Sequence, residues 1–390
     1  MTSDQPAFTS GQFVRILIKT GLLFVLVNLL WAVLQPLPLL ESISVYTHLV
    51  KGRTRLPYGL SAEDYNLSPS RLGTLFATHE INTPKAADEF RVIVLGDSSV
   101  WGILLRPQET LTEQLNGLNL AAADGRPMHF YNLAYPMNSV LKDRVLLDSA
   151  LTYQPDLILW LVTLESMTRD NQFEPPLLLA NRDVVQSVLA ADGLNWDTSR
   201  VPFVTSSAWD TTLLGQRRVT ADWLRLQAYG VVWSSTGIDQ IYKDYTPRSN
   251  DFDTDVTWHG FTPDTPFTAS DPTFDVLMAG VKRAGSVPMM FINEPVYIAD
   301  GTNSDLHYNA WSPRWAYDLY RKLFAETAAA QGWAYADAWN QIPSSEFTDS
   351  PVHLTPTGSH ALAQWIGQQL TSVLDSTAAL TSHPLRQGAR

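Results

Sequence analysis

Five short apolar segments constrain the fold of this chain more than any other feature. Each is rich in β-branched and aromatic residues, as the buried strands of a parallel sheet are. The segments cover residues 90–95, 129–133, 157–162, 287–292 and 333–336. Helical patterns lie between them, and parallel strands require such crossovers. The sequence therefore predicts an α/β fold built on a three-layer, doubly wound parallel sheet of about five strands.

The two C-terminal helices have clear boundary signals. One is expected to have Ser312 as its cap and Pro313 as its first residue, and to stop at Gly332. The last is expected to begin at Thr355 and Pro356 and to carry its apolar residues on one face. Alternation of strand and helix thus continues towards the end of the chain.

The connection between the third and fourth strands is much longer than a simple crossover. It covers residues 163–286, whereas a crossover unit needs only a few tens of residues. Within it, 181–191 and 211–240 have helical patterns, and 245–272 is rich in Asp, Thr, Pro and Phe. We expect a large helical and loop insertion, about residues 167–272, that caps the carboxyl ends of the strands.

A long apolar segment near the N-terminus predicts a membrane-spanning helix. From Ile16 to Leu34 its length is close to the roughly 20 residues that cross a bilayer. Lys19 can extend its amine to the headgroups, and Trp31 lies near the far end, where the interface suits its ring. No small-residue cleavage site follows, which favours an uncleaved signal anchor over a removed signal peptide. A buried core helix is the alternative.

Basic residues beside this segment predict its orientation. Arg15 and Lys19 adjoin it on the N-terminal side. Lys51, Arg53 and Arg55 lie further away on the other side. The positive-inside rule then favours a cytoplasmic N-terminus and a body outside the cytoplasm, with the lipid bilayer as a partner of the chain.

These segments divide the chain into four parts. We expect a cytoplasmic tail and transmembrane helix, a juxtamembrane linker, a sheet domain with its insertion, and a polar tail, at residues 1–40, 41–89, 90–376 and 377–390. The linker shows weak helical patterning, and its apolar residues do not recur at a clear helical spacing.

Composition excludes several kinds of function. Lys and Arg number 27 against 39 Asp and Glu, a net charge of −12, so the chain lacks the basic footprint that nucleic acid requires. It has no cysteine, which excludes disulfides, thiolate nucleophiles and Cys-ligated metals. The eight histidines form no HExxH or His-x-His pair. We therefore expect no metal and no cofactor.

One loop resembles the first half of a calcium site. Asp251, Asp253 and Asp255 have the spacing of the first ligands. However, Val256 stands where the turn needs glycine, and Thr262 stands where a bidentate Glu is required. The loop is not expected to bind calcium.

Two short blocks carry residues that suit nucleophilic catalysis. Ser98 lies in Gly96-Asp97-Ser98, directly after the first strand, where a tight turn into a helix exposes a hydroxyl beside backbone amides. His353 follows the last strand and precedes the last helix. The carboxyl ends of parallel strands share one rim, so we expect these two side chains to meet there. Asp97 is expected to hold the turn through its own backbone bonds.

In this order and at opposite ends of the domain, these blocks resemble those of the SGNH (GDSL-type) hydrolase family. The resemblance covers residues 91–102, 132–139, 155–166 and 349–358 and excludes the insertion. It implies a flavodoxin-like strand order, Ser98 as nucleophile and His353 as base. It also implies esterase, lipase or acyl-transfer chemistry.

The chain departs from the family at the oxyanion-binding positions. The second block begins at Asn132, which the resemblance places among the oxyanion and substrate-binding residues. The residue that corresponds to the family's oxyanion glycine is Met137, whose backbone N–H could serve if Met takes the required conformation. The third block has Glu165 where the family has a donating Asn. An ionised Glu cannot donate, so Glu165 helps only if burial keeps it protonated. Otherwise it marks a repurposed site.

Two further positions remain open at this rim. The family's Asp lies three residues before the His, but here Ser350 stands there and Asp349 is one residue too early. Asp349 either reaches His353 through a bulged turn, or the site is a Ser–His dyad. Asn293 ends the fourth strand, where it could contact substrate or simply end the strand.

Three functions are therefore open. The first is a membrane-anchored esterase acting on acyl esters of a cell-envelope glycan or lipid. The second is an O-acyltransferase on an exported polysaccharide, with the insertion keeping water from the acyl-enzyme. The third is a catalytically degenerate glycan-binding or scaffold protein.

Overall fold

A computed structural model of the protein describes residues 9–381 except 60–64, 206 and 243, with side chains as far as Thr371. Its five strands form one parallel sheet in the order β2-β1-β3-β4-β5. They are β1 (Phe90–Leu95), β2 (Met128–Asn132), β3 (Leu157–Val162), β4 (Met289–Asn293) and β5 (Ala334–Asp337). This is the flavodoxin-like order, and the predicted fold class is confirmed. Every predicted strand is present, with its ends shifted by at most two residues.

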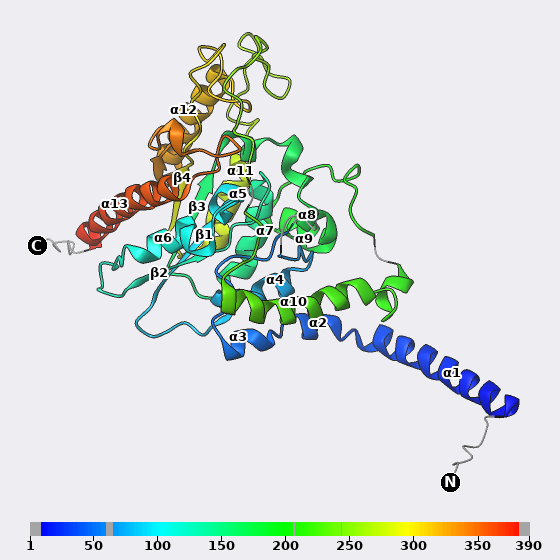
Figure 1. The fold of residues 1–390 in the computed structure, drawn as a ribbon. Coiled ribbons are helices and arrows are strands. Elements are labelled where there is room, and N and C mark those ends of the chain that lie inside the picture. Colours follow the sequence, from blue (N-terminus) through cyan, green and yellow to red (C-terminus); the bar gives the residue numbers. More distant parts are fainter. Residues whose placement is uncertain (1–8, 60–64, 206, 243, 382–390) are drawn as a thin grey trace, which may run out of the picture.

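Helices cover both faces of the sheet (Figure 1). Ile93 and Leu95 of β1 face one layer, which consists of α7 (Val140–Leu151), α11 (Phe274–Ala284) and α12 (Arg314–Gln331). Val92 and Val94 face the other, which consists of α5 (Ser98–Trp101), α6 (Leu111–Gly117) and α13 (Pro356–Thr381). Alternate residues of each strand thus enter opposite cores, which explains why the strands are continuously apolar.

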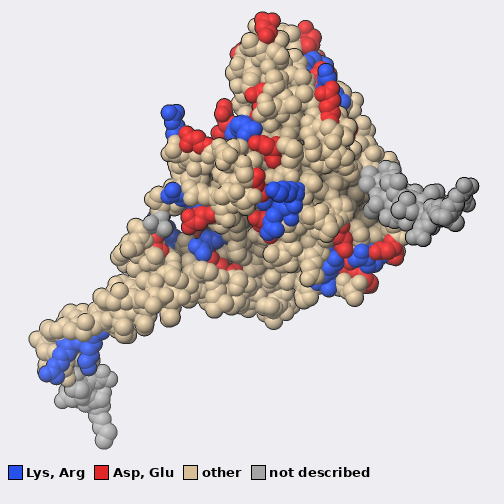
Figure 2. All heavy atoms as spheres, turned by 180° about the vertical axis from the view of Figure 1, so that it is seen from behind, with Lys and Arg blue, Asp and Glu red and all other residues tan. Residues whose placement is uncertain are grey.

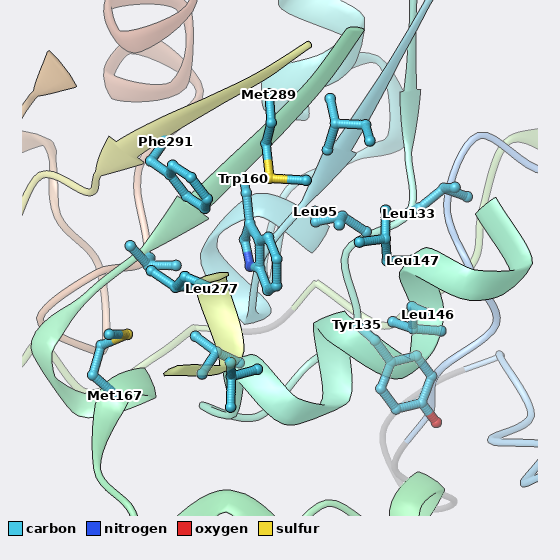
Figure 3. Close-up of a cluster of buried hydrophobic side chains, with 14 of the residues drawn as sticks. Leu95, Leu133, Tyr135, Leu146, Leu147, Trp160, Met167, Leu277, Met289 and Phe291 are labelled. Atoms are coloured by element: carbon cyan, nitrogen blue, oxygen red, sulfur yellow. The ribbon is translucent and has the colours of Figure 1, made fainter. Parts of the chain in front are cut away.

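Trp160 of β3 fills the centre of the first core (Figure 3). Its ring lies close to α11, where a Cβ on Gly280 would be 2.5 Å from the indole. Glycine therefore lets this helix approach the sheet. The indole N–H donates to the buried carboxylate of Asp143 at 3.1 Å, so the only polar atom of the side chain is satisfied.

The insertion after β3 does not form the single cap that its position suggested. Its helices α8 (Pro176–Ala180) and α9 (Arg182–Asp192) pack against α7 on the flank of the sheet. Helix α10 (Arg217–Thr236) lies along α3 (Val45–Leu49) instead. The later part of the insertion does reach the rim, where His259 lies 3.0 Å from Glu165.

The segment expected to be a linker is part of the domain. Leu56, Leu75 and Ile81 are fully buried in the first core, and α4 (Leu72–Thr78) is buried along most of its length. Arg55 makes an isolated parallel bridge to Asn132 at the end of β2. The described residues of 41–89 therefore extend the edge of the sheet and do not form a separate linker.

Two buried arginines tie this segment to the insertion. The guanidinium of Arg55 makes two bonds to the carboxylate of Asp239, which follows α10, and a third to the carbonyl oxygen of Gly102 at 2.8 Å. Arg53 adds an ion pair to Asp239 at 3.4 Å. Although burial opposes it, the two guanidinium charges lower the pKa of Asp239.

Helix α1 (Ser10–Leu34) projects from the body (Figure 1). Among the described residues it is the one helix long and apolar enough to cross a membrane, with a mean hydropathy of 2.2. None of its residues is buried, so it is not a core helix. Its basic residues gather at the end far from the body, as Figure 2 shows. A short helix, α2 (Leu37–Glu41), follows it.

Two predictions for the C-terminal helices need correction. Pro313 is the N-cap of α12 rather than its first residue, and neither it nor Ser312 provides a side-chain cap. Gly332 ends the helix with φ 67°, as expected. Helix α13 continues to Thr381, so the predicted polar tail at 377–390 begins inside a helix, and 382–390 lie outside the described residues.

Removing one partner of the Arg55–Asp239 pair should destabilise the domain strongly. We expect Arg55→Ala to lower the free energy of unfolding by about 3–5 kcal/mol, because it leaves the Asp239 carboxylate buried with too few donors. Arg225→Ala, which breaks an exposed pair with Asp222, should cost only about 0–1 kcal/mol. Urea unfolding of the full chain in detergent measures both values. Equal losses in the two variants would contradict the structural role of Arg55.

Candidate active site

The turn after β1 presents Ser98 at the start of α5. The carboxylate of Asp97 caps this helix by accepting the Ser99 N–H at 2.8 Å, which confirms the expected role of Asp97. A Cβ on Gly96 would lie 2.6 Å from the Val100 side chain, so only glycine lets the chain turn this tightly. Ser98 is the first residue of the helix, and its N–H therefore has no acceptor within it.

Ser98, His353 and Asp349 form a continuous hydrogen-bonded series. Ser98 Oγ lies 2.8 Å from His353 Nε2, and His353 Nδ1 lies 2.8 Å from Asp349 Oδ1. An ionised carboxylate only accepts, so the proton on the ring belongs to Nδ1. Nε2 then has its lone pair free to accept the Ser98 hydroxyl proton. This is the arrangement by which a histidine activates a serine.

A tight loop brings Asp349 back to His353 across four residues. Its ends pair through the bridge between Phe347 and Leu354, and the Thr348 N–H donates to the His353 carbonyl oxygen at 2.9 Å. Ser350, which stands where the resemblance puts the Asp, accepts the His353 N–H at 3.1 Å. The acid that bonds to His353 is therefore Asp349, one residue before the position at which the family has its Asp.

The charge state of Asp349 suits an orienting role. Burial alone would raise its pKa, but the hydrogen bond and charge of His353 outweigh burial and hold the pKa below its usual range. The carboxylate is therefore ionised at neutral pH, where it fixes the tautomer of the imidazole and stabilises its protonated form.

Met137 has the backbone conformation that a glycine would normally supply. Its φ is 83°, in the left-handed region. Backbone bonds from Leu133 to Val94 and from Tyr135 to Gly96 hold this loop alongside the Ser98 turn. Within the described chain, neither the Met137 N–H nor the Ser98 N–H donates to another residue. Met137 thus has the backbone conformation that the sequence analysis required of it, and both amides lack a backbone acceptor among the described residues.

The structure does not bring the amides of Asn132 and Asn293 into the site. Asn132 is fully buried and donates to the Val100 carbonyl oxygen at 2.8 Å, which ties β2 to α5. Asn293 is also buried, and it donates to Asp337 at 2.8 Å and to the Tyr317 hydroxyl at 3.3 Å. Both residues brace the sheet, so their predicted roles in substrate binding need correction.

Glu165 is paired rather than isolated. Its Oε1 lies 3.0 Å from Nε2 of His259, which the insertion brings to the rim, and 3.5 Å from the Asn171 amide. The hydrogen bond to Glu165 raises the pKa of His259. The positive charge of a protonated His259 offsets the negative charge of the Glu165 carboxylate. This pairing is an alternative to the protonated Glu165 that the sequence analysis considered. No local signal in the sequence linked these two residues.

Sequence reasoning also missed the role of Glu294. This buried carboxylate accepts the Ser99 hydroxyl at 2.7 Å, directly below the nucleophile turn. Burial, reinforced by the charge of Asp97, raises its pKa well above the usual value. Through this bond Glu294 joins α5 to the end of β4. Among the described residues, no group of three or more His, Asp or Glu could hold a metal ion.

Comparisons with known proteins add little to this geometry. No family model and no curated protein matches the chain. Solved structures similar to it include a carbohydrate acetylesterase from Sinorhizobium meliloti (TM-score 0.34, 10% identity, 73% of this chain and 99% of that one). An aryl esterase from M. smegmatis has a TM-score of 0.33 and 12% identity, over 72% of this chain and 98% of the other. Values this low assign neither a family nor an activity.

The Glu165–His259 pair predicts a pH dependence. Because the pKa of His259 is raised, the pair stabilises the fold fully below the unfolded histidine pKa of about 6.5 and loses that effect as pH rises through the folded value. Glu165→Gln should bring the His259 pKa back towards 6.5, as histidine NMR titration would detect. It should also destabilise the protein more at pH 5.5 than at pH 9.

The matched control is Glu326→Gln, an exposed acid on α12. It should leave the His259 titration unchanged. An unchanged His259 pKa in Glu165→Gln would show that the two side chains do not interact in solution.

Proposed function

We propose that this protein is a membrane-anchored serine esterase of the SGNH type. The observation that carries the proposal is the pair of 2.8 Å bonds that join Ser98 to His353 and His353 to Asp349. A serine, an imidazole and an ionised acid in this order suit attack on an ester carbonyl.

Each group then has a defined part in the reaction. Ser98 Oγ attacks the ester carbonyl carbon as its proton passes to His353 Nε2, and the N–H groups of Ser98 and Met137 bind the oxyanion. The tetrahedral intermediate expels the alcohol, which takes the proton from His353. Water then gives a proton to His353 and attacks the acyl-enzyme. Collapse of this second intermediate releases the carboxylic acid and restores Ser98, which regains the proton.

Hydrolysis is favoured over transfer to a second alcohol. A transferase must keep water from the acyl-enzyme, and the predicted insertion cap was the feature that would do so. In the structure, α8, α9 and α10 pack elsewhere. The segment that carries His259 reaches the rim, but one third of the Asp349 side chain stays exposed. A degenerate binding protein is less favoured because it would need no bonded serine, histidine and acid, whereas the two 2.8 Å bonds join all three.

The anchoring helix suggests the substrate class and the side of the membrane. Helix α1 keeps the site near a bilayer, so we propose acyl esters of a cell-envelope glycan or lipid as substrates. Because Arg15 and Lys19 flank its N-terminal end, we propose that the catalytic domain lies outside the cytoplasm. Labelling of Glu326→Cys in intact cells by a membrane-impermeant maleimide tests this side, and labelling only after lysis would contradict it.

Ester hydrolysis is the direct test of the proposal. The full chain in detergent should hydrolyse a short activated ester such as p-nitrophenyl acetate. Ser98→Ala and His353→Ala should abolish the esterase rate, and Asp349→Asn should reduce kcat by on the order of 10³–10⁴ because the imidazole loses its tautomer and orientation.

A surface serine supplies the control. Ser235→Ala removes an exposed hydroxyl on α10 and should retain the parent rate. Activity that survives in Ser98→Ala would place the nucleophile elsewhere. Inactivity of the folded parent towards aryl, glycan and lipid acetates alike would contradict esterase function.

A further inference from the structure

The insertion contacts the anchoring helix itself. Three polar side chains near the C-terminal end of α1 meet the segment 211–216. The bonds join Asn28 Oδ1 to the Leu214 N–H (3.0 Å), the Trp31 indole N–H to Gln216 Oε1 (2.6 Å), and the Gln35 amide N–H to the Thr211 carbonyl oxygen (3.0 Å). The rest of α1 between Gly21 and Leu34 is apolar.

The three side chains lie on one face of α1. Asn28, Trp31 and Gln35 are spaced by three and four residues, which stacks them on a single side. These three are half-buried, whereas Val33 on the opposite side is 80% exposed. The insertion therefore docks against one side of the helix and leaves the other side free for lipid.

The position of Asn28 shows how far along α1 the contact with the insertion extends. It lies six residues before the end of α1, about 9 Å along the axis, where a polar group facing hydrocarbon would be costly. Its amide N–H donates to the Phe24 carbonyl oxygen at 2.9 Å, and its oxygen accepts from Leu214. The Leu214 N–H of the insertion thus gives the Asn28 side chain a hydrogen-bond donor that lipid hydrocarbon cannot provide.

The segment 211–216 forms a bend that lies against α1. Thr211 bonds to Gln35, just after the C-terminal end of α1, and Leu214 bonds to Asn28, nearer the N-terminal end. Gln216 bonds to Trp31, which lies between these two positions. A Cβ on Gly215 would lie only 2.1 Å from the Trp209 carbonyl oxygen, so the bend requires glycine.

The flanks of this bend have the chemistry of a membrane interface. Trp209 at its start is 55% exposed, and indole rings favour the headgroup level. Arg217 and Arg218 follow it and are exposed, in a chain with a net charge of −12. Guanidinium groups at this level can bind lipid phosphates.

We propose that residues 209–218 form a second membrane contact, docked on α1 at the boundary between headgroups and hydrocarbon. The inference rests on the proposed anchoring by α1. Helix α10 begins within this segment and runs along the body beside α3 (Figure 1). Asp239, which follows α10, pairs with Arg55, and Arg55 bonds to Gly102 at the end of α5. The contact thus holds the active site at a fixed orientation above the bilayer.

Cross-linking in membranes tests the docking. Because the chain has no cysteine, Asn28→Cys with Leu214→Cys gives the only thiol pair. A short bifunctional thiol reagent should join them in membrane vesicles. The matched pair Val33→Cys with Leu214→Cys, on the opposite side of α1, should cross-link at least tenfold less. Equal yields from the two pairs would overturn the docking.

Fluorescence quenching tests the depth. Single cysteines at Trp209, Val33 and Glu326 carry an environment-sensitive dye in the full chain, reconstituted in phosphatidylcholine–phosphatidylglycerol vesicles. A lipid with a nitroxide near its headgroup should quench the dyes at 209 and 33 but not at 326. Quenching at 33 without quenching at 209 would overturn the second contact and leave the anchor in place. Loss of quenching at both would overturn the anchor and, with it, this inference.

Discussion

The common direction of the five strands is the constraint on which the site depends. Because all of them are parallel, their carboxyl ends meet at one edge, and the segments that follow β1 and β5 lie side by side there. Ser98 and His353 thus form a hydrogen bond although they are 255 positions apart. A strand running in the opposite direction at either place would send its loop to the other edge.

The nucleophile turn is braced by buried charge as well as by apolar packing. Lys142 is fully buried, and its ammonium donates to the Gly96 carbonyl oxygen at 2.8 Å and pairs with Asp143. On another side, Arg55 bonds to Gly102, and Glu294 accepts the Ser99 hydroxyl. Charges withdrawn from water are stable only when their partners are well placed. These bonds therefore fix the position of Ser98 more sharply than apolar contacts alone could.

Local patterns predicted the sheet and the serine–histidine pair, because both are set by short stretches of chain. Buried strands are continuous apolar runs, and Ser98 and His353 each follow one. The sequence failed where long-range contacts decide orientation. Asn132 and Asn293 stand at strand ends as expected, but neighbouring elements take up their amides. The pairing of Glu165 with His259 depends on how an insertion folds back, which no short pattern encodes.

The central claim is that His353 activates Ser98. Intact-mass analysis of the full chain after treatment with a fluorophosphonate tests it most directly, since only an activated serine reacts rapidly with this reagent. The account predicts one adduct, mapped to Ser98 by peptide analysis and lost in both Ser98→Ala and His353→Ala. No adduct on the folded parent protein, or an adduct on Ser99 instead, would contradict it.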